Sequence, residues 1–105
     1  MIEVLNKYHI ENEFLGFEFV SIMRKESVLG NPFPLSKYSR KESLRRYRLW
    51  LWARIKDRGA VYKELIRIIN LSNRSNVALV CCCKPLACHG DIIKSAIEWI
   101  VKWAS

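Results

Sequence analysis

The chain has 105 residues, half of them apolar and about a quarter charged, a composition typical of soluble globular domains. This length accommodates one hydrophobic core, so we predict a single domain over residues 1–105. No run of about eighteen apolar residues is present, which excludes a membrane-spanning helix, and the N-terminal pattern is unlike a signal or transit peptide; we therefore expect a cytoplasmic protein.

The net charge of +8 is concentrated in the middle third of the chain. Residues 37–74 hold twelve Lys or Arg side chains against three acidic ones, whereas the flanking thirds are nearly balanced. Such a local excess is typical of proteins that bind nucleic acid or another acidic partner. It is equally typical of the solvated helical face of a small protein, and both interpretations stay open.

Two strands and a long loop are predicted in the first third. Residues 2–6 and 17–22 show the apolar and alternating patterns of strands. Residues 24–38 then form a loop, in which each of two prolines forces the residue before it into extended backbone. A loop of that length in a compact domain is usually functional or mobile.

Two helices are predicted in the middle third. Ser39 and Glu42 have the spacing of a capping box, and the helix that they open should end near Asp57. A second helix is expected over residues 60–70. The first helix should bury one face and expose a basic face on the opposite side. The residues expected on the buried face are Leu44, Tyr47, Leu51 and Ile55.

The last third combines a buried strand with a terminal helix. Residues 77–83 begin with a continuous apolar run, and residues 91–103 have helical periodicity. The order strand, strand, helix, helix, strand, helix predicts an α/β domain in which about three helices pack on a short, mostly parallel sheet. We expect the first and last strands to pair in parallel through a right-handed crossover.

All four cysteines and one of the two histidines lie within residues 81–91. The side chains of Cys81, Cys83, Cys88 and His89 are of the types that bind zinc, although their spacing is unlike that of a standard zinc knuckle. Our main expectation is therefore that the domain has no cofactor, with zinc as an alternative.

Two further interpretations of the same stretch compete with zinc. Cys88 would lie at a helix N-terminus, where the helix dipole stabilises a thiolate, so it could act as a nucleophile with His89 as acid or base. Alternatively the three consecutive cysteines fill the core of a strand, and Asp91 is only a helix N-cap. Whether the chain is an enzyme stays open.

Several motifs spread along the chain resemble one known family. They are Asn6 with Lys7, Arg24, the Leu-Gly-Asn-Pro-Phe sequence of residues 29–33, Tyr47, and Cys81 with residues 83–91. Together they resemble domain of unknown function family 4326, which comprises small domains of bacteria and tailed phages. Met23 departs from the pattern, because the family usually has glycine there. The resemblance implies no particular reaction.

The two longest motifs lie in loops, and loop motifs usually mark sites. If the strands before them are parallel neighbours, both loops project from one edge of the sheet and share a pocket, which the end of the first strand could join. The expected ligand-binding residues are Asn6, Arg24, Gly30, Asn31, Pro32, Phe33 and Lys84, and the expected catalytic residues are Cys88, His89 and Asp91. These groups suit a phosphate-bearing or nucleobase-like ligand.

The basic helix supports an alternative function without catalysis. Its exposed face would contact nucleic-acid phosphates and stack a base on tryptophan. The residues expected in this role are Arg45, Arg48, Trp52 and Lys56. A nucleotide-type ligand, nucleic acid and a structural zinc ion are thus the partners that the sequence leaves in competition, and no membrane contact is expected.

Overall fold

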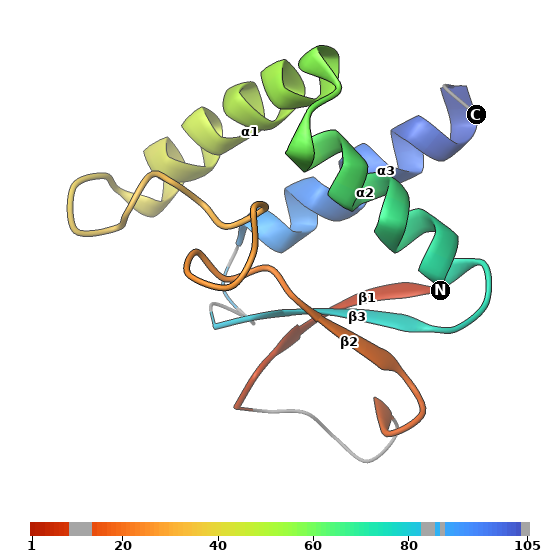
Figure 1. Ribbon diagram of the computed structural model, residues 1–105. Helices are drawn as coiled ribbons and strands as arrows, with labels where there is room; N and C mark the ends of the chain where they lie inside the picture. Colours follow the sequence, from red (N-terminus) through yellow and green to blue (C-terminus); the bar gives the residue numbers. More distant parts are fainter. Residues whose placement is uncertain (9–13, 83–85, 87, 104–105) are drawn as a thin grey trace.

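A parallel sheet of three strands forms the base of the molecule, and three helices lie on one side of it (Figure 1). The computed structural model describes residues 1–8, 14–82, 86 and 88–103. Within these residues the elements are β1 (Ile2–Asn6), β2 (Glu18–Ser21), α1 (Arg40–Asp57), α2 (Ala60–Ser72), β3 (Val77–Cys81) and α3 (His89–Trp103). The expected α/β class, with its short parallel sheet and three helices, is confirmed.

The last strand in sequence, β3, is the central strand of the sheet. It pairs in parallel with β1 on one side and with β2 on the other, so that Asn6 lies opposite Cys81 and Ser21 lies opposite Val80. All five of its residues are buried. Alternate side chains of a strand point to opposite faces, and the helix-side core accordingly contains Val77, Leu79 and Cys81. The predicted parallel pairing of the first and last strands is therefore confirmed.

The helix α1 begins and ends at identifiable caps. The hydroxyl of Ser39 accepts a hydrogen bond from the backbone N–H of Glu42 at 3.1 Å, as the predicted capping box requires. The Glu42 carboxylate does not return to the cap, because it binds the guanidinium groups of Arg45 and Arg46 instead. The helix ends where Arg58 adopts a left-handed conformation and its N–H donates to the carbonyl of Ile55.

At the start of α1, the buried face is shifted by one residue from the predicted face, from Leu44 to Ser43. Tyr47, Leu51 and Ile55 are buried as expected, but the first buried side chain is that of Ser43, and Leu44 is half-buried. The hydroxyl of Tyr47 is fully buried and donates a hydrogen bond of 2.6 Å to the carbonyl of Leu29. This bond attaches the loop after β2 to the middle of α1.

The boundaries around the cysteine-rich stretch differ from the prediction. The strand β3 ends at Cys81 and Cys82 is exposed, so Cys82 does not fill the core; Cys83 lies outside the described residues. The helix α3 begins at His89, two residues earlier than predicted, so Asp91 lies within the first turn and is not its N-cap. Tertiary packing of the first turn explains the earlier start, because His89 and Gly90 are both buried. None of the described helices is long and apolar enough to cross a membrane.

Replacing Tyr47 by phenylalanine tests the contact between α1 and the loop. The Y47F variant leaves the Leu29 carbonyl buried without its donor, so we expect the free energy of unfolding to fall by about 1–3 kcal/mol. Urea denaturation followed by circular dichroism measures this change. Tyr62 is only half-buried and provides the matched control, for which the Y62F change should stay within about 0.5 kcal/mol. Equal losses in the two variants would contradict the assigned role of the Tyr47 hydroxyl.

Candidate functional site

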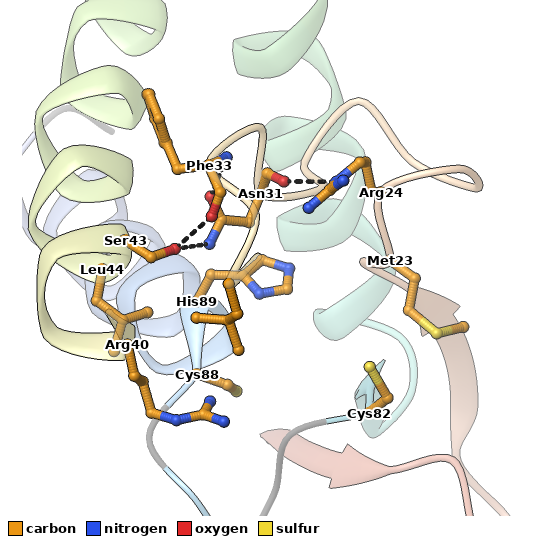
Figure 2. A pocket seen from close by; sticks show the side chains of 11 residues that line it. Met23, Arg24, Asn31, Phe33, Arg40, Ser43, Leu44, Cys82, Cys88 and His89 are labelled. Carbon is orange, nitrogen blue, oxygen red and sulfur yellow. Dashed lines mark hydrogen bonds between the residues drawn. The ribbon is translucent and has the colours of Figure 1, made fainter. Parts of the chain in front are cut away.

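A cavity of about 280 Å³ lies beside the carboxyl ends of the strands. Its walls come from the loop after β2, the first turn of α1, the residue after β3 and the start of α3 (Figure 2). Sites in parallel α/β sheets form at this edge, because the loops that follow the strands converge there. The lining residues are Met23, Arg24, Asn31, Phe33, Leu35, Arg40, Ser43, Leu44, Cys82, Cys88 and His89.

The loop that forms one wall is folded tightly on itself. Gly30 lies so close to the backbone of Arg24 that a Cβ atom at residue 30 would be 2.2 Å from the Arg24 Cα atom. The side chain of Arg24 also holds the loop together, because its Nε donates a hydrogen bond of 3.0 Å to the carbonyl of Asn31. Gly30 is therefore needed for the path of the loop and does not itself line the cavity.

A buried hydroxyl attaches this loop to α1. Ser43 is fully buried, donates to the carbonyl of Phe33 at 2.6 Å and accepts from Nδ2 of Asn31 at 2.8 Å. The Oδ1 atom of Asn31 accepts from the backbone N–H of Phe33 at 2.9 Å. Both ends of the Asn31 amide are thus engaged in holding the loop, as Figure 2 shows for the bond to Ser43. Asn31 lines the cavity, but its side-chain amide already makes the hydrogen bonds that hold the loop in place.

His89 lines the cavity and is bound to the backbone through one ring nitrogen. Its Nε2 lies 2.6 Å from the carbonyl oxygen of Ile22, and since a carbonyl only accepts, Nε2 carries the proton. Burial lowers the pKa of His89 below its ordinary value, so the ring is neutral and Nδ1 keeps a lone pair. No described residue bonds to Nδ1, and every fully buried polar side-chain atom in the described part has a partner. His89 is also one of the residues that line the cavity.

The thiol of Cys88 is not activated as the sequence predicted. Its Sγ lies 3.5 Å from Sγ of Cys81, and the hydrogen bond with that thiol, together with burial, raises the pKa of Cys88 well above its ordinary value. The backbone N–H of Gly90 acts in the opposite direction, as expected at a helix N-terminus, but it is outweighed. The thiol of Cys88 is therefore protonated at neutral pH.

The cavity is lined by charged and apolar side chains, and its two arginines lie on opposite sides of it (Figure 2). Arg24 is exposed and Arg40, the first residue of α1, is half-buried. The apolar lining residues are Met23, Phe33, Leu35 and Leu44. The ring of Phe33 is half-buried and meets Tyr38 edge to face, with the ring centres 5.9 Å apart.

The remaining predicted ligand-binding and catalytic residues that the structure describes do not line this cavity. Asn6 ends β1, where its Oδ1 accepts from the backbone N–H of Tyr8, and it is not among the lining residues. Pro32 and Asp91 are exposed and do not line it either. Lys84 lies outside the described residues.

Sequence reasoning missed half of the cavity wall. The first turn of α1 contributes Arg40, Ser43 and Leu44, whose spacing of three and four residues is that of a single helical face. That spacing was visible in the sequence. It did not reveal that this face meets the loop after β2, because the meeting depends on how the helix packs.

The predicted nucleic-acid face of α1 is only partly exposed. Trp52 is half-buried, and its ring meets Trp99 of α3 edge to face at 5.1 Å, so it does not offer an open stacking surface. Arg45 forms a 2.6 Å ion pair with Glu42. Arg48 and Lys56 are exposed on α1 away from the cavity.

The described residues contain no group of three or more His, Cys, Asp or Glu side chains that could share a metal ion. The side chain of His89 is turned to the Ile22 carbonyl, which leaves Cys81 and Cys88 as the described members of the ligand set that the sequence suggested. Cys83, the remaining member, lies outside the described residues.

Comparison with known proteins identifies the family. The family model described as Domain of unknown function (DUF4326) matches residues 6–99, which is most of the chain. Neither the curated proteins nor the solved structures compared with the chain provide a match. The chain belongs to the DUF4326 family, and the resemblance noted in its sequence is confirmed.

Substituting Gly30 tests the tight loop that builds the cavity. In G30A the new methyl group meets backbone atoms of Arg24, which cannot move independently, so we expect the free energy of unfolding to fall by about 1–3 kcal/mol. Gly16 is the control, since a Cβ there has no neighbour within 4 Å and G16A should leave stability unchanged or slightly raised. Urea unfolding measures both, and an unaffected G30A would show that the loop follows another path.

The protonation state of His89 can be tested through the pH dependence of stability. Because burial lowers its pKa in the folded state, the unfolded chain binds more protons as the pH falls below about 6.5. The stability that neutral His89 contributes is present above that pH and is lost below it. We therefore expect the difference in unfolding free energy between wild type and H89Q to shrink between about pH 7.5 and about pH 5, by at most about 1.4 kcal/mol per pH unit. The other histidine is present in both proteins, so a difference that is independent of pH would mean that the His89 pKa is not shifted by folding.

Proposed function

We propose that this DUF4326 domain binds a small phosphate-bearing ligand with a nucleobase-like ring, such as a nucleotide or a nucleic-acid-derived fragment. The observation that carries the proposal is the composition of one cavity, whose lining residues include two arginines, several apolar residues with one phenylalanine among them, and a histidine. An anion, a planar ring and a hydrogen-bond donor on the ligand would each find a complementary group there.

The size of the cavity restricts the ligand. At about 280 Å³ it lies just below the roughly 300–1,000 Å³ typical of small-molecule sites. A mononucleotide with its phosphate at the open rim suits this volume, whereas a dinucleotide cofactor would extend far into solvent. The ligand is therefore expected to be a single nucleotide unit or smaller.

Two arginines are suited to the phosphate. Arginine binds phosphate oxygens through pairs of parallel N–H donors. The Nε of Arg24 is bound to the Asn31 carbonyl, which fixes the guanidinium group at the rim of the cavity. Arg40 lies at the N-terminus of α1, where the helix dipole also favours negative charge. These features support binding of the phosphate by an arginine of the cavity wall.

The apolar lining residues suit a planar ring. Phe33 is half-buried and lines the cavity, as do Leu44 and Leu35, and an aromatic side chain that stacks on a base contributes about 1–3 kcal/mol to binding. The Nδ1 atom of His89 would accept a hydrogen bond from an amino or hydroxyl group of the ligand. If the domain also processes its ligand, this neutral nitrogen is the proton acceptor that the cavity offers.

Isothermal titration calorimetry with mononucleotides, the corresponding nucleosides and inorganic phosphate tests the proposal. We expect at least one mononucleotide to bind more tightly than its nucleoside or phosphate alone. The R24Q and R40Q variants should each weaken that binding about 10- to 100-fold, because a hydrogen bond to a charged group contributes about 1.5–3 kcal/mol.

The matched control is R48Q, which removes an exposed arginine of α1 that does not line the cavity. Its affinity should remain within about twofold of wild type. An equal loss in R48Q would move the binding surface to the basic face of α1 and favour the nucleic-acid alternative. If no mononucleotide binds at millimolar concentration, the proposed function is wrong.

A further inference from the structure

Two buried thiols face each other beneath the cavity. Cys81 is the last residue of β3 and Cys88 directly precedes α3, and their exposed fractions are only 1% and 2%. Their Sγ atoms lie 3.5 Å apart, which is van der Waals contact between sulfurs. The proposed binding function does not use this pair of thiols. Of the two residues, Cys88 alone lines the cavity, and its thiol is protonated.

We propose that Cys81 and Cys88 are a redox-active pair that forms a reversible disulfide bond and so joins the end of β3 covalently to the start of α3. A disulfide requires sulfurs about 2.05 Å apart, so the two atoms need to approach by about 1.5 Å, which small rotations of two side chains can supply. The pair is separated by only seven positions in sequence, so the bond closes a short ring.

The oxidant is a small disulfide of the glutathione class. Cys88, which lines the cavity, loses its proton, and its sulfur attacks one sulfur of the oxidant. The S–S bond of the oxidant breaks, and the first small thiol leaves with the proton. Cys81 then loses its proton and attacks the Cys88 sulfur, which releases the second small thiol. Two cysteine thiols are oxidised and one small disulfide is reduced to two thiols, so atoms and electrons balance.

The position of the pair gives the bond a structural consequence. Cys88 and the next residue, His89, both line the cavity. Drawing the Cys88 sulfur toward β3 moves it away from the cavity and fixes the backbone that leads into His89. Oxidation is therefore expected to leave the fold intact, to raise its melting temperature, and to change the shape of the cavity wall.

The primary experiment incubates the wild-type protein in glutathione redox buffers, quenches it with acid, alkylates the remaining thiols and maps them by peptide mass spectrometry. We expect Cys81 and Cys88 to become protected from alkylation together, with the loss of two hydrogens from the monomer and full reversal by dithiothreitol. Cys82, which is exposed, should remain open to alkylation or carry a glutathione adduct.

Variants separate this pair from the other two cysteines. The C82S/C83S double variant retains only Cys81 and Cys88 and should still form the bond, whereas C81S and C88S should form none between these positions. The proposal is overturned if the double variant folds, as judged by circular dichroism, and keeps two alkylatable thiols. It is also overturned if the wild-type link uses Cys82 or Cys83, or joins two chains. None of these outcomes depends on whether a nucleotide binds.

Discussion

Parallel pairing of both outer strands with β3 places the carboxyl ends of all three strands at one edge of the sheet. Strands that run in the same direction need long connections between them, and the helices α1 and α3, which follow β2 and β3, begin near this edge. As a result the first turns of α1 and α3 both line the cavity, together with the loop after β2. The position of the candidate site thus follows from strand direction, before any individual side chain is considered.

The elements could be predicted from the sequence where pattern and packing agree. The apolar run of β3 predicts a strand that is buried on both faces, and Ser39 marks the start of α1. The start of α3 could not be found in this way, because Cys88 is a weak cap signal. The helix begins at His89, whose ring is bound to the Ile22 carbonyl, a contact that joins residues 67 positions apart.

The candidate site, like the start of α3, depends on contacts between distant residues that the sequence does not reveal. Sequence reasoning brought together five residues of the cavity wall, namely Arg24, Asn31, Phe33, Cys88 and His89. It assigned Asn31 to a ligand, but the amide is used by Ser43 and by the backbone of Phe33. A residue type shows which bonds a side chain can make, while only the fold shows which of them are already made. The reversed pKa expectation for Cys88 has the same origin, since the Cys81 thiol that outweighs the helix N-terminus belongs to another element.

The Cys-His-Gly sequence at the start of α3 can be understood through the three strands beneath it. The Cys88 sulfur contacts Cys81 of β3, the His89 ring binds the carbonyl of Ile22 just after β2, and Gly90 lies against Val4 of β1, where a Cβ would approach within 2.6 Å. Three consecutive residues thus attach the first turn of one helix to every strand of the sheet. The sulfur of Cys88 is a small polarisable atom that packs against the sulfur of Cys81. The imidazole of His89 reaches the Ile22 carbonyl and supplies a hydrogen-bond donor. Gly90 has no side chain and so permits the closest approach of the helix to β1. These contacts use Nε2 of the histidine and the sulfur of Cys88, so the residues that hold the helix on the sheet are also two of the residues that line the cavity.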